Sequence, residues 1–154
     1  MVENKDKNLR PIYWIITIIS LICLIFSIVI YLEKTQYSVN HNNICSAITG
    51  TNGCEVVQTS SYGKTFGIDN PIYGIIGFFA LGLFSTILIW KHNLWLKWLT
   101  VAGGIMSSIV AIIFIYLQAF VIHAYCLFCM IVDTLSLVLL GLVIYIIIRT
   151  FKHK

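Results

Sequence analysis

Four of the five cysteines in this chain form two groups whose spacing suits thiol–disulfide chemistry. Cys45 and Cys54 lie in a polar segment, and Cys126-Leu127-Phe128-Cys129 is a C-x-x-C motif. A thiolate attacks a disulfide, forms a mixed disulfide and is then displaced by a second thiol, so two neighbouring pairs can pass electrons in sequence. The pattern predicts a redox relay in which these four cysteines are catalytic.

Each cysteine group also has a non-catalytic interpretation. Cys45 and Cys54, taken alone, suit a structural loop disulfide, and the C-x-x-C motif suits packing inside an apolar helix. Four cysteines can bind zinc, but that arrangement is more typical of soluble ribbons, and we predict no metal. Cys23 lies within an apolar stretch, where a free cysteine packs as a small hydrophobic residue. The presence of both pairs in one chain favours the relay.

Asp133 is an acidic residue in an apolar segment. It follows Cys129 by four residues and Cys126 by seven, which places all three on one face of a helix. An ionisable group within a membrane is costly and therefore indicates a functional site, here a proton donor or acceptor for thiol and quinone chemistry. The alternative is a neutral carboxylic acid hydrogen-bonded to a neighbouring helix. We interpret His123 as an interfacial residue rather than a base.

The composition indicates that these residues are positioned by membrane helices. The chain is 59% hydrophobic and 10% charged, whereas soluble domains average about 45–50% and about 25%. Four apolar stretches predict transmembrane helices, because lipid offers no partners to backbone polar groups. Their predicted bounds are about 12–32, 71–90, 98–120 and 124–148, with an outer loop at 33–70. The predicted fold is one all-α membrane domain over residues 1–154, a four-helix bundle with a long extracytoplasmic loop between helices 1 and 2.

The distribution of Lys and Arg predicts the orientation of this bundle. With a cytoplasmic N-terminus, only Lys34 and Lys64 of the ten Lys and Arg residues lie outside, as the positive-inside rule expects. Both termini are then cytoplasmic and both cysteine pairs extracytoplasmic, where disulfides persist. The formal charge of +4 thus sets orientation and does not indicate a nucleic-acid partner. The residue usage suggests a prokaryotic plasma membrane; a eukaryotic source would imply the endoplasmic reticulum membrane.

Smaller features complete the expected architecture. Cys126 opens the fourth stretch, where unpaired helical N–H groups favour a thiolate over a thiol. A short helix is expected over Glu55 to Tyr62, with Cys54 near its first turn. Small residues in the third stretch, including Gly104 and Ser108, predict close helix packing in lipid.

Several motifs accompany the cysteines in a fixed order. They are the segment from Cys54 to Tyr62, Gly67-Ile68 followed by Asn70-Pro71-Ile72-Tyr73-Gly74, and Ala124-Tyr125-Cys126-Leu127-Phe128-Cys129. This set resembles the vitamin K epoxide reductase family over nearly the whole chain. Bacterial disulfide-bond membrane oxidases also use four helices and two cysteine pairs, but their C-x-x-C comes first in the chain, whereas here the separated pair comes first.

The resemblance implies roles for the four cysteines. Cys126 and Cys129 would form the quinone-facing disulfide, with Cys129 closest to the quinone. Cys54 would pass electrons to Cys126, and Cys45 would exchange with the thiols of a partner. Prokaryotic-type members often carry a fused thioredoxin-like domain. This sequence contains none, which implies a separate thioredoxin-fold partner.

The resemblance also implies a quinone, of the menaquinone, ubiquinone or vitamin K type. Ser60 and Asn70 match family positions near the quinone, and Tyr73 belongs to the same helix-entry motif. Asp133 replaces a tyrosine of vertebrate members, which makes epoxide reduction a less favoured activity. The candidate quinone-binding residues are therefore Ser60, Asn70, Tyr73 and Asp133.

The predicted function is a quinone-dependent thiol–disulfide oxidoreductase that supports disulfide formation in exported proteins. The alternatives are a reductase of quinone or vitamin K epoxide that serves quinone recycling, a non-catalytic membrane protein with a structural loop disulfide, and a carrier that uses Asp133 and the cysteines as ligands.

Overall fold

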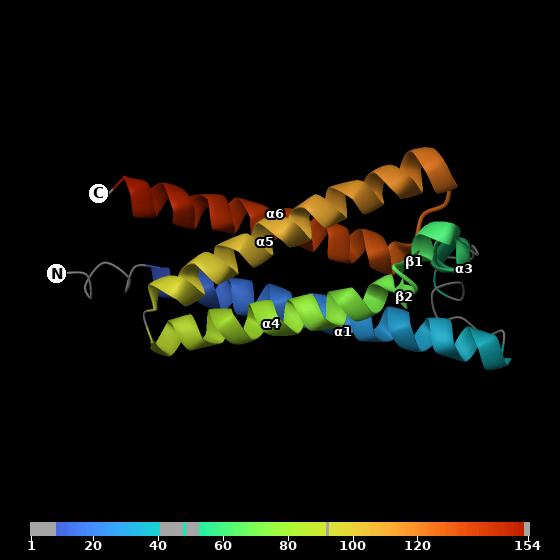
Figure 1. Cartoon of the computed structure of the whole chain (residues 1–154), viewed down its shortest axis with the longest axis horizontal. Helices are drawn as coiled ribbons and strands as arrows, with labels where there is room; N and C mark the ends of the chain where they lie inside the picture. The colour runs from blue at the N-terminus through green and yellow to red at the C-terminus, as the bar shows by residue number, and fades with distance from the viewer. Residues whose placement is uncertain (1–8, 41–47, 49–52, 92, 153–154) are drawn as a thin grey trace.

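Long apolar helices dominate the fold. The computed structural model describes residues 9–40, 48, 53–91 and 93–152. Within these residues, four helical segments are long and apolar enough to cross a membrane, which confirms the predicted four-helix membrane bundle (Figure 1). They are α1 (Arg10–Asn40), α4 (Asn70–Trp90), α5 (Leu94–Tyr116) with its continuation η3 (Leu117–Ile122), and α6 (Leu127–Phe151).

Several helix ends differ from the predicted ones, and three of them have a local cause. The first helix does not end at residue 32 but continues to Asn40, because polar residues outside a membrane can still be helical. The third begins at Leu94 rather than residue 98, where the Asn93 side chain accepts a hydrogen bond from the Trp95 N–H at 3.0 Å. The fourth begins at Leu127 rather than residue 124, because His123 is left-handed, with φ 53°, and Cys126 is extended.

The bundle consists of two closely packed helix pairs. α1 packs along α4 and α5 packs along α6, while α4–α5 and α1–α6 contacts join the pairs. Small and hydroxylated residues line both seams: Thr17 of α1 donates to Ser85 of α4 at 3.0 Å, and Ser108 of α5 donates to the Ser136 carbonyl of α6 at 2.7 Å. Gly104 is buried against Val143. The small residues of the third stretch thus allow close approach, as expected in lipid.

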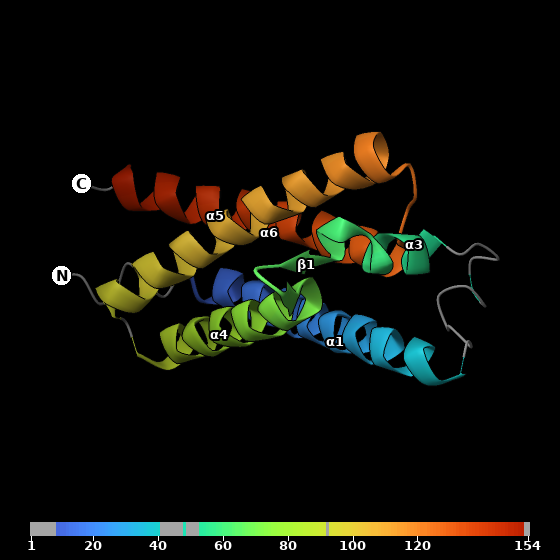
Figure 2. The ribbon, with the colours of Figure 1, turned by 45° about the vertical axis from the view of Figure 1, so that its right-hand side comes forward.

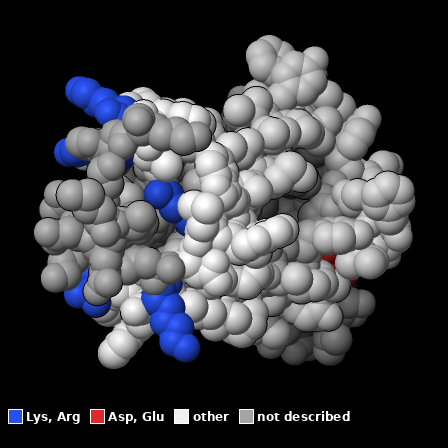
Figure 3. Space-filling view, turned by 60° about the vertical axis from the view of Figure 1, so that its left-hand side comes forward, with Lys and Arg blue, Asp and Glu red and all other residues white. Residues whose placement is uncertain are grey.

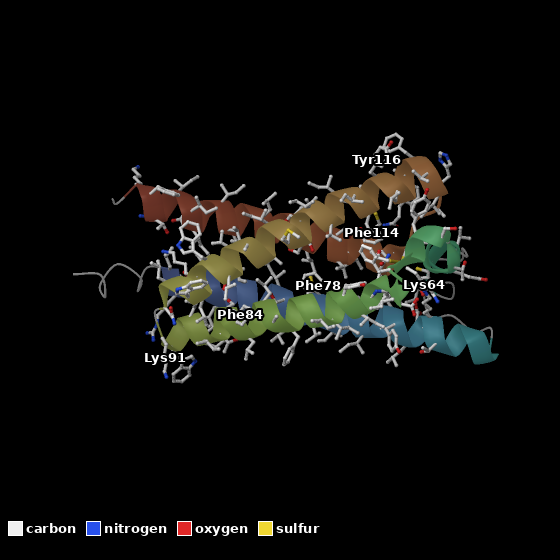
Figure 4. All side chains as sticks on the ribbon, in the orientation of Figure 1. Lys64, Phe78, Phe84, Lys91, Phe114 and Tyr116 are labelled. Carbon is white, nitrogen blue, oxygen red and sulfur yellow. A yellow bond between two sulfur atoms is a disulfide. The ribbon has the colours of Figure 1, made fainter. Side chains whose placement is uncertain are left out.

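The two ends of the bundle carry different features. Figure 1 places both termini and the α4–α5 connection at one end, and α3, β1 and β2 at the other. Figure 4 shows Lys91 at the first end and Lys64 at the second. All four tryptophans, at positions 14, 90, 95 and 98, are exposed near the terminal end, and Tyr73, Tyr116 and Tyr125 are exposed near the other. Two aromatic zones separated by apolar helix are typical of the two interfaces of a membrane.

Among the described residues, the connection between α1 and α4 holds the other regular elements. Its elements are α3 (Gly53–Thr59), the 3-10 turn η2 (Ser61–Gly63) and the antiparallel strands β1 (Lys64–Thr65) and β2 (Ile68–Asp69). The predicted short helix is present as α3 with Cys54 in its first turn, but it begins at Gly53 and ends at Thr59 instead of covering residues 55–62. The strand pair was not predicted. Phe66 and Gly67 form its two-residue turn with φ values of 52° and 80°, the left-handed conformations that such hairpin turns require.

An ion pair attaches this hairpin to α1 and provides a pH-dependent test. Lys34 donates to the Asp69 carboxylate at 2.6 Å, and this hydrogen bond, helped by the charges of Lys34 and Lys64, lowers the pKa of Asp69. The pair therefore stabilises the fold above about pH 4, the ordinary range of an aspartate, and its contribution is lost as the pH falls through the lower folded-state pKa. Because the pair is partly exposed, we expect the contribution to be less than about 1 kcal/mol.

Thermal unfolding at a series of pH values measures this contribution. The free energy of unfolding of the wild type should fall by a small amount in acid. Asp69→Asn lacks the ion pair at every pH and should not show this fall. An acid step of the same size in both proteins would contradict the assignment.

Candidate active site

The C-x-x-C cysteines stand at the first turn of α6. Cys126 and Cys129 are joined by a disulfide. Cys126 is the N-cap of the helix, with φ −93° and ψ 113°, and its Sγ accepts a hydrogen bond from the Cys129 N–H at 3.3 Å. When the disulfide opens, a thiolate at Cys126 would be held by this N–H and by the positive end of the helix. The expected placement of Cys126 at a helix start is thus confirmed.

The backbone before α6 determines where this helix begins. The last turn before it, η3, is a π-helix, and His123 then adopts the left-handed conformation. Residues 123–126 are non-helical. The chain reverses direction there and enters α6 with Cys126 as the N-cap of the helix. π-Helical turns are rare and often occur at functional sites.

Cys54 lies against this same end of α6. α3 contacts both α6 and η3, and Figure 2 shows it beside the start of α6. The approach involves backbone: a Cβ on Gly53 would collide with the Tyr125 carbonyl oxygen. Glycine at position 53 therefore allows α3 to contact the segment that leads into the C-x-x-C motif.

A second apolar cluster, separate from the main core, encloses the sulfur atoms. Its buried members are Ile30, Cys54, Val57, Cys126 and Phe128, and we call it the cysteine cluster. Cys54 is 3% exposed and Cys126 0%. Cys54 is also disulfide-bonded, while Cys45 lies outside the described residues. The structure thus brings the helix cysteine of α3 and the capping cysteine of α6 into one water-excluded cluster.

Cys129 has a different environment from Cys126. It is only partly buried, and it packs at the edge of the cysteine cluster, where Phe26, Ile131 and Val132 are also partly buried. Of the two bonded sulfur atoms, that of Cys129 therefore belongs to the less enclosed residue and has apolar neighbours.

Asp133 is buried and hydrogen-bonded to a residue that the sequence had not singled out. Gln118, 0% exposed, lies in η3. Its Nε2 donates to Asp133 Oδ2 at 3.3 Å, and its Oε1 accepts the Cys126 N–H at 2.9 Å. The contact agrees with one part of the alternative interpretation of Asp133, namely that its carboxyl group is hydrogen-bonded to a neighbouring helix. The available signal for Gln118 was that it is the only amide side chain between residues 98 and 120.

The candidate quinone residues of the outer connection make local hydrogen bonds. Ser60 Oγ donates to the Val57 carbonyl at 2.7 Å. Asn70 accepts from Thr65 Oγ1 at 2.7 Å and donates to the Tyr62 carbonyl at 2.6 Å, and the Tyr73 hydroxyl donates to the Thr65 carbonyl at 3.1 Å. Asn70 and Tyr73 therefore fasten η2 and β1 to the start of α4. A direct quinone contact by these residues stays a prediction.

Cys23 lies outside the cysteine cluster. It is a free, fully buried cysteine that packs in the main core with Tyr13, Ile16 and Ile19. This agrees with its interpretation as a small packing residue. It also makes Cys23 a matched control for substitutions of the redox cysteines.

Comparison with known proteins agrees with the geometry. A search among curated proteins finds no match to the sequence. A family model described as the vitamin K epoxide reductase family matches residues 14–144, a range that includes most of the four membrane helices and all of the described cysteines. Four apolar helices with a disulfide at the start of the last one are consistent with a membrane oxidoreductase. The chain therefore belongs to the vitamin K epoxide reductase family of membrane oxidoreductases.

Proposed function

We propose that the protein oxidises the dithiol of a separate thioredoxin-fold partner and transfers the electrons to a membrane quinone. The net reaction converts one dithiol and one quinone to one disulfide and one hydroquinone, so two electrons and two protons move together. The partner, once oxidised, would introduce disulfides into exported proteins.

The observation that carries this proposal is the shared burial of Cys54 and Cys126 in the cysteine cluster. Disulfide exchange requires the attacking sulfur to contact the sulfur it attacks. A structural disulfide in the loop would not need α3 to approach α6 through the backbone contact at Gly53. The arrangement instead supports a transfer of electrons from the loop pair to the helix pair.

After the partner has reduced the loop pair, two exchange reactions carry the electrons to the helix pair. The partner first reduces Cys45–Cys54 and is itself oxidised. The Cys54 thiolate then attacks Cys126, breaks the Cys126–Cys129 bond and releases a Cys129 thiolate. The Cys45 thiolate next attacks Cys54, restores the loop disulfide and releases Cys126 as a thiolate at the N-cap of α6. The helix pair is now reduced by two electrons and the loop pair is ready for another partner.

The residues around Cys129 suit an apolar electron acceptor. Phe26, Ile131 and Val132 are apolar, partly buried and packed against the same cluster as Cys129, and buried Asp133 lies one helical turn further along α6. A bound quinone supplies the acceptor for two electrons and two protons, and Asp133 exchanges protons with the dithiol. Ser60, Asn70 and Tyr73 remain candidate contacts to the quinone head.

The charge distribution supports an extracytoplasmic site. Arg10, Lys91, Lys97, Arg149 and Lys152 lie at the end that carries the termini, where Figure 3 shows Lys and Arg side chains gathered. The positive-inside rule makes this end cytoplasmic. The cysteine cluster at the other end then faces an oxidising compartment, in a plasma membrane for a prokaryotic source.

Anaerobic quinone reduction by the purified protein tests the proposal. With a dithiol donor, the wild type and Cys23→Ala should turn over equally, and Cys126→Ala should lose turnover by about 100-fold or more because exchange with Cys54 stops. The same loss in Cys23→Ala would indicate a folding effect. Equal activity of Cys126→Ala and wild type, or no activity of folded wild type with several quinones, would refute the relay.

A further inference from the structure

Gln118 spans the gap between the redox disulfide and the buried carboxyl group. Its side chain is completely buried, and its two polar atoms contact two different parts of α6: the backbone N–H of Cys126 and the carboxylate of Asp133. Burying a primary amide is unfavourable unless its polar atoms are hydrogen-bonded. An apolar side chain would fill this position without that requirement, so the amide is best explained by what it contacts.

The direction of the two hydrogen bonds is determined by the chemistry. A backbone N–H can only donate, so the Gln118 atom facing Cys126 must be the carbonyl oxygen. The NH₂ group must then face Asp133 and donate to it. The amide thus links Cys126 to Asp133 in one orientation, which a flip of the side chain would break at both ends.

We infer that Gln118 is a positioning residue of the redox centre, which holds the Asp133 carboxyl group in place for proton exchange while the Cys126–Cys129 bond opens and closes. This inference rests on the proposed function. When the disulfide opens, the Cys126 side chain loses its covalent bond to Cys129, and only the backbone and the capping hydrogen bond still connect Cys126 to the first turn of α6. An anchor on the Cys126 N–H keeps that residue in place, and the same side chain fixes the carboxyl group one turn beyond Cys129.

Two substitutions of Gln118 separate positioning from packing. Gln118→Leu keeps the bulk of the side chain and removes both hydrogen bonds. Gln118→Glu keeps an oxygen for the Cys126 N–H, but its second oxygen replaces the NH₂ donor only when it carries a proton. Two adjacent carboxyl groups titrate as a coupled pair, so this variant should hold Asp133 in place only while the pair retains a proton.

Other titratable groups near Asp133 must be accounted for. Among the described residues, Cys23 of α1 interacts electrostatically with Asp133, and Cys126 and Cys129 share its helix. Tyr116 of α5 is exposed and points away from the bundle (Figure 4). The pH profiles are therefore compared in a Cys23→Ala background. The titratable groups that remain around Asp133 are then the redox cysteines and, in Gln118→Glu, the introduced carboxyl group.

The expected result is a fall in kcat for Gln118→Leu of roughly tenfold or more, as for loss of a positioned acid–base group, with the KM for the dithiol unchanged. Gln118→Glu should retain turnover at low pH and lose it as the pH rises and the shared proton is released. Gln58→Leu, a matched substitution in α3 outside this network, should match wild type.

A quinone-free measurement keeps this inference separate from the proposed function. The equilibrium of Cys126–Cys129 with a glutathione redox buffer should differ between wild type and Gln118→Leu, and its pH dependence should change in Gln118→Glu. Folded Gln118→Leu with wild-type kcat and wild-type equilibrium would overturn the inference. So would a Gln118→Glu profile identical to that of wild type, which decides the matter even if Gln118→Leu fails to fold. Absence of quinone turnover in wild type would count against the proposed function alone.

Discussion

Cys129→Ser protein is expected to accumulate a covalent Cys54–Cys126 link and to lose quinone reduction. In this variant the Cys126 thiolate attacks Cys54 of the loop disulfide and releases a Cys45 thiolate. No second thiol remains in α6 to break the new bond, and alkylation of the released Cys45 thiolate prevents it from reversing the exchange, so the mixed disulfide is trapped. Turnover should fall by about 100-fold or more. Mass spectrometry of the alkylated, non-reduced protein identifies the linked peptides.

The control for this trap is a cysteine that takes no part in the relay. Cys23→Ser removes a thiol from the main core and should yield no new link and near-normal turnover. A link between Cys45 and Cys126 in the Cys129→Ser protein would reverse the order of the two loop cysteines. Undiminished turnover would show that the electrons reach the quinone by another route.

Gly53→Ala is expected to uncouple the loop pair from the helix pair. The added methyl group would collide with the Tyr125 carbonyl oxygen, and because both atoms are held by backbone, α3 must shift away from the start of α6. Misplacing reacting groups by about 1 Å can slow a reaction by about 100-fold. Dithiol-driven turnover should therefore fall by roughly 10- to 100-fold, and the reduced loop pair should accumulate beside an oxidised helix pair.

Alkylation during steady-state turnover reveals this distribution. Cys54 should become modified in Gly53→Ala, while Cys126 and Cys129 stay protected as a disulfide. Gly77→Ala is the matched control, because a Cβ there meets no atom within 4 Å. If Gly53→Ala is folded and turns over like Gly77→Ala, the close approach of α3 does not limit electron transfer.

The membrane helices could be predicted from sequence because lipid leaves the backbone few alternatives. Apolar length alone located all four, and lipid requires a helix wherever the chain crosses it. The ends were harder to predict. α1 continues to Asn40 through polar residues that a hydropathy pattern predicts to be loop. α6 begins later than predicted because His123 adopts a left-handed conformation. Both depend on local backbone conformation, which a hydropathy pattern does not report.

The candidate site was predictable where it depends on spacing along one helix. Cys126, Cys129 and Asp133 belong to one helix, so their arrangement follows from its period. The contact of Asp133 with Gln118 depends on how η3 is rotated against α6, and a π-helical turn changes that rotation in a way the pattern of apolar residues does not reveal. The hydrogen bonds of Asn70 and Tyr73 to the hairpin likewise require strands too short to be recognised in sequence.

The sulfur cap of α6 turns a backbone amide into a reporter of the catalytic cycle. The Cys129 N–H points at Cys126 Sγ, and a charged acceptor forms a stronger hydrogen bond than a neutral one. The amide should therefore be held more tightly when Cys126 is a thiolate than when it is part of a disulfide. The nuclear magnetic resonance frequency of the Cys129 amide and the rate at which it exchanges with deuterated water would then report the oxidation state of the enzyme without a substrate or a dye.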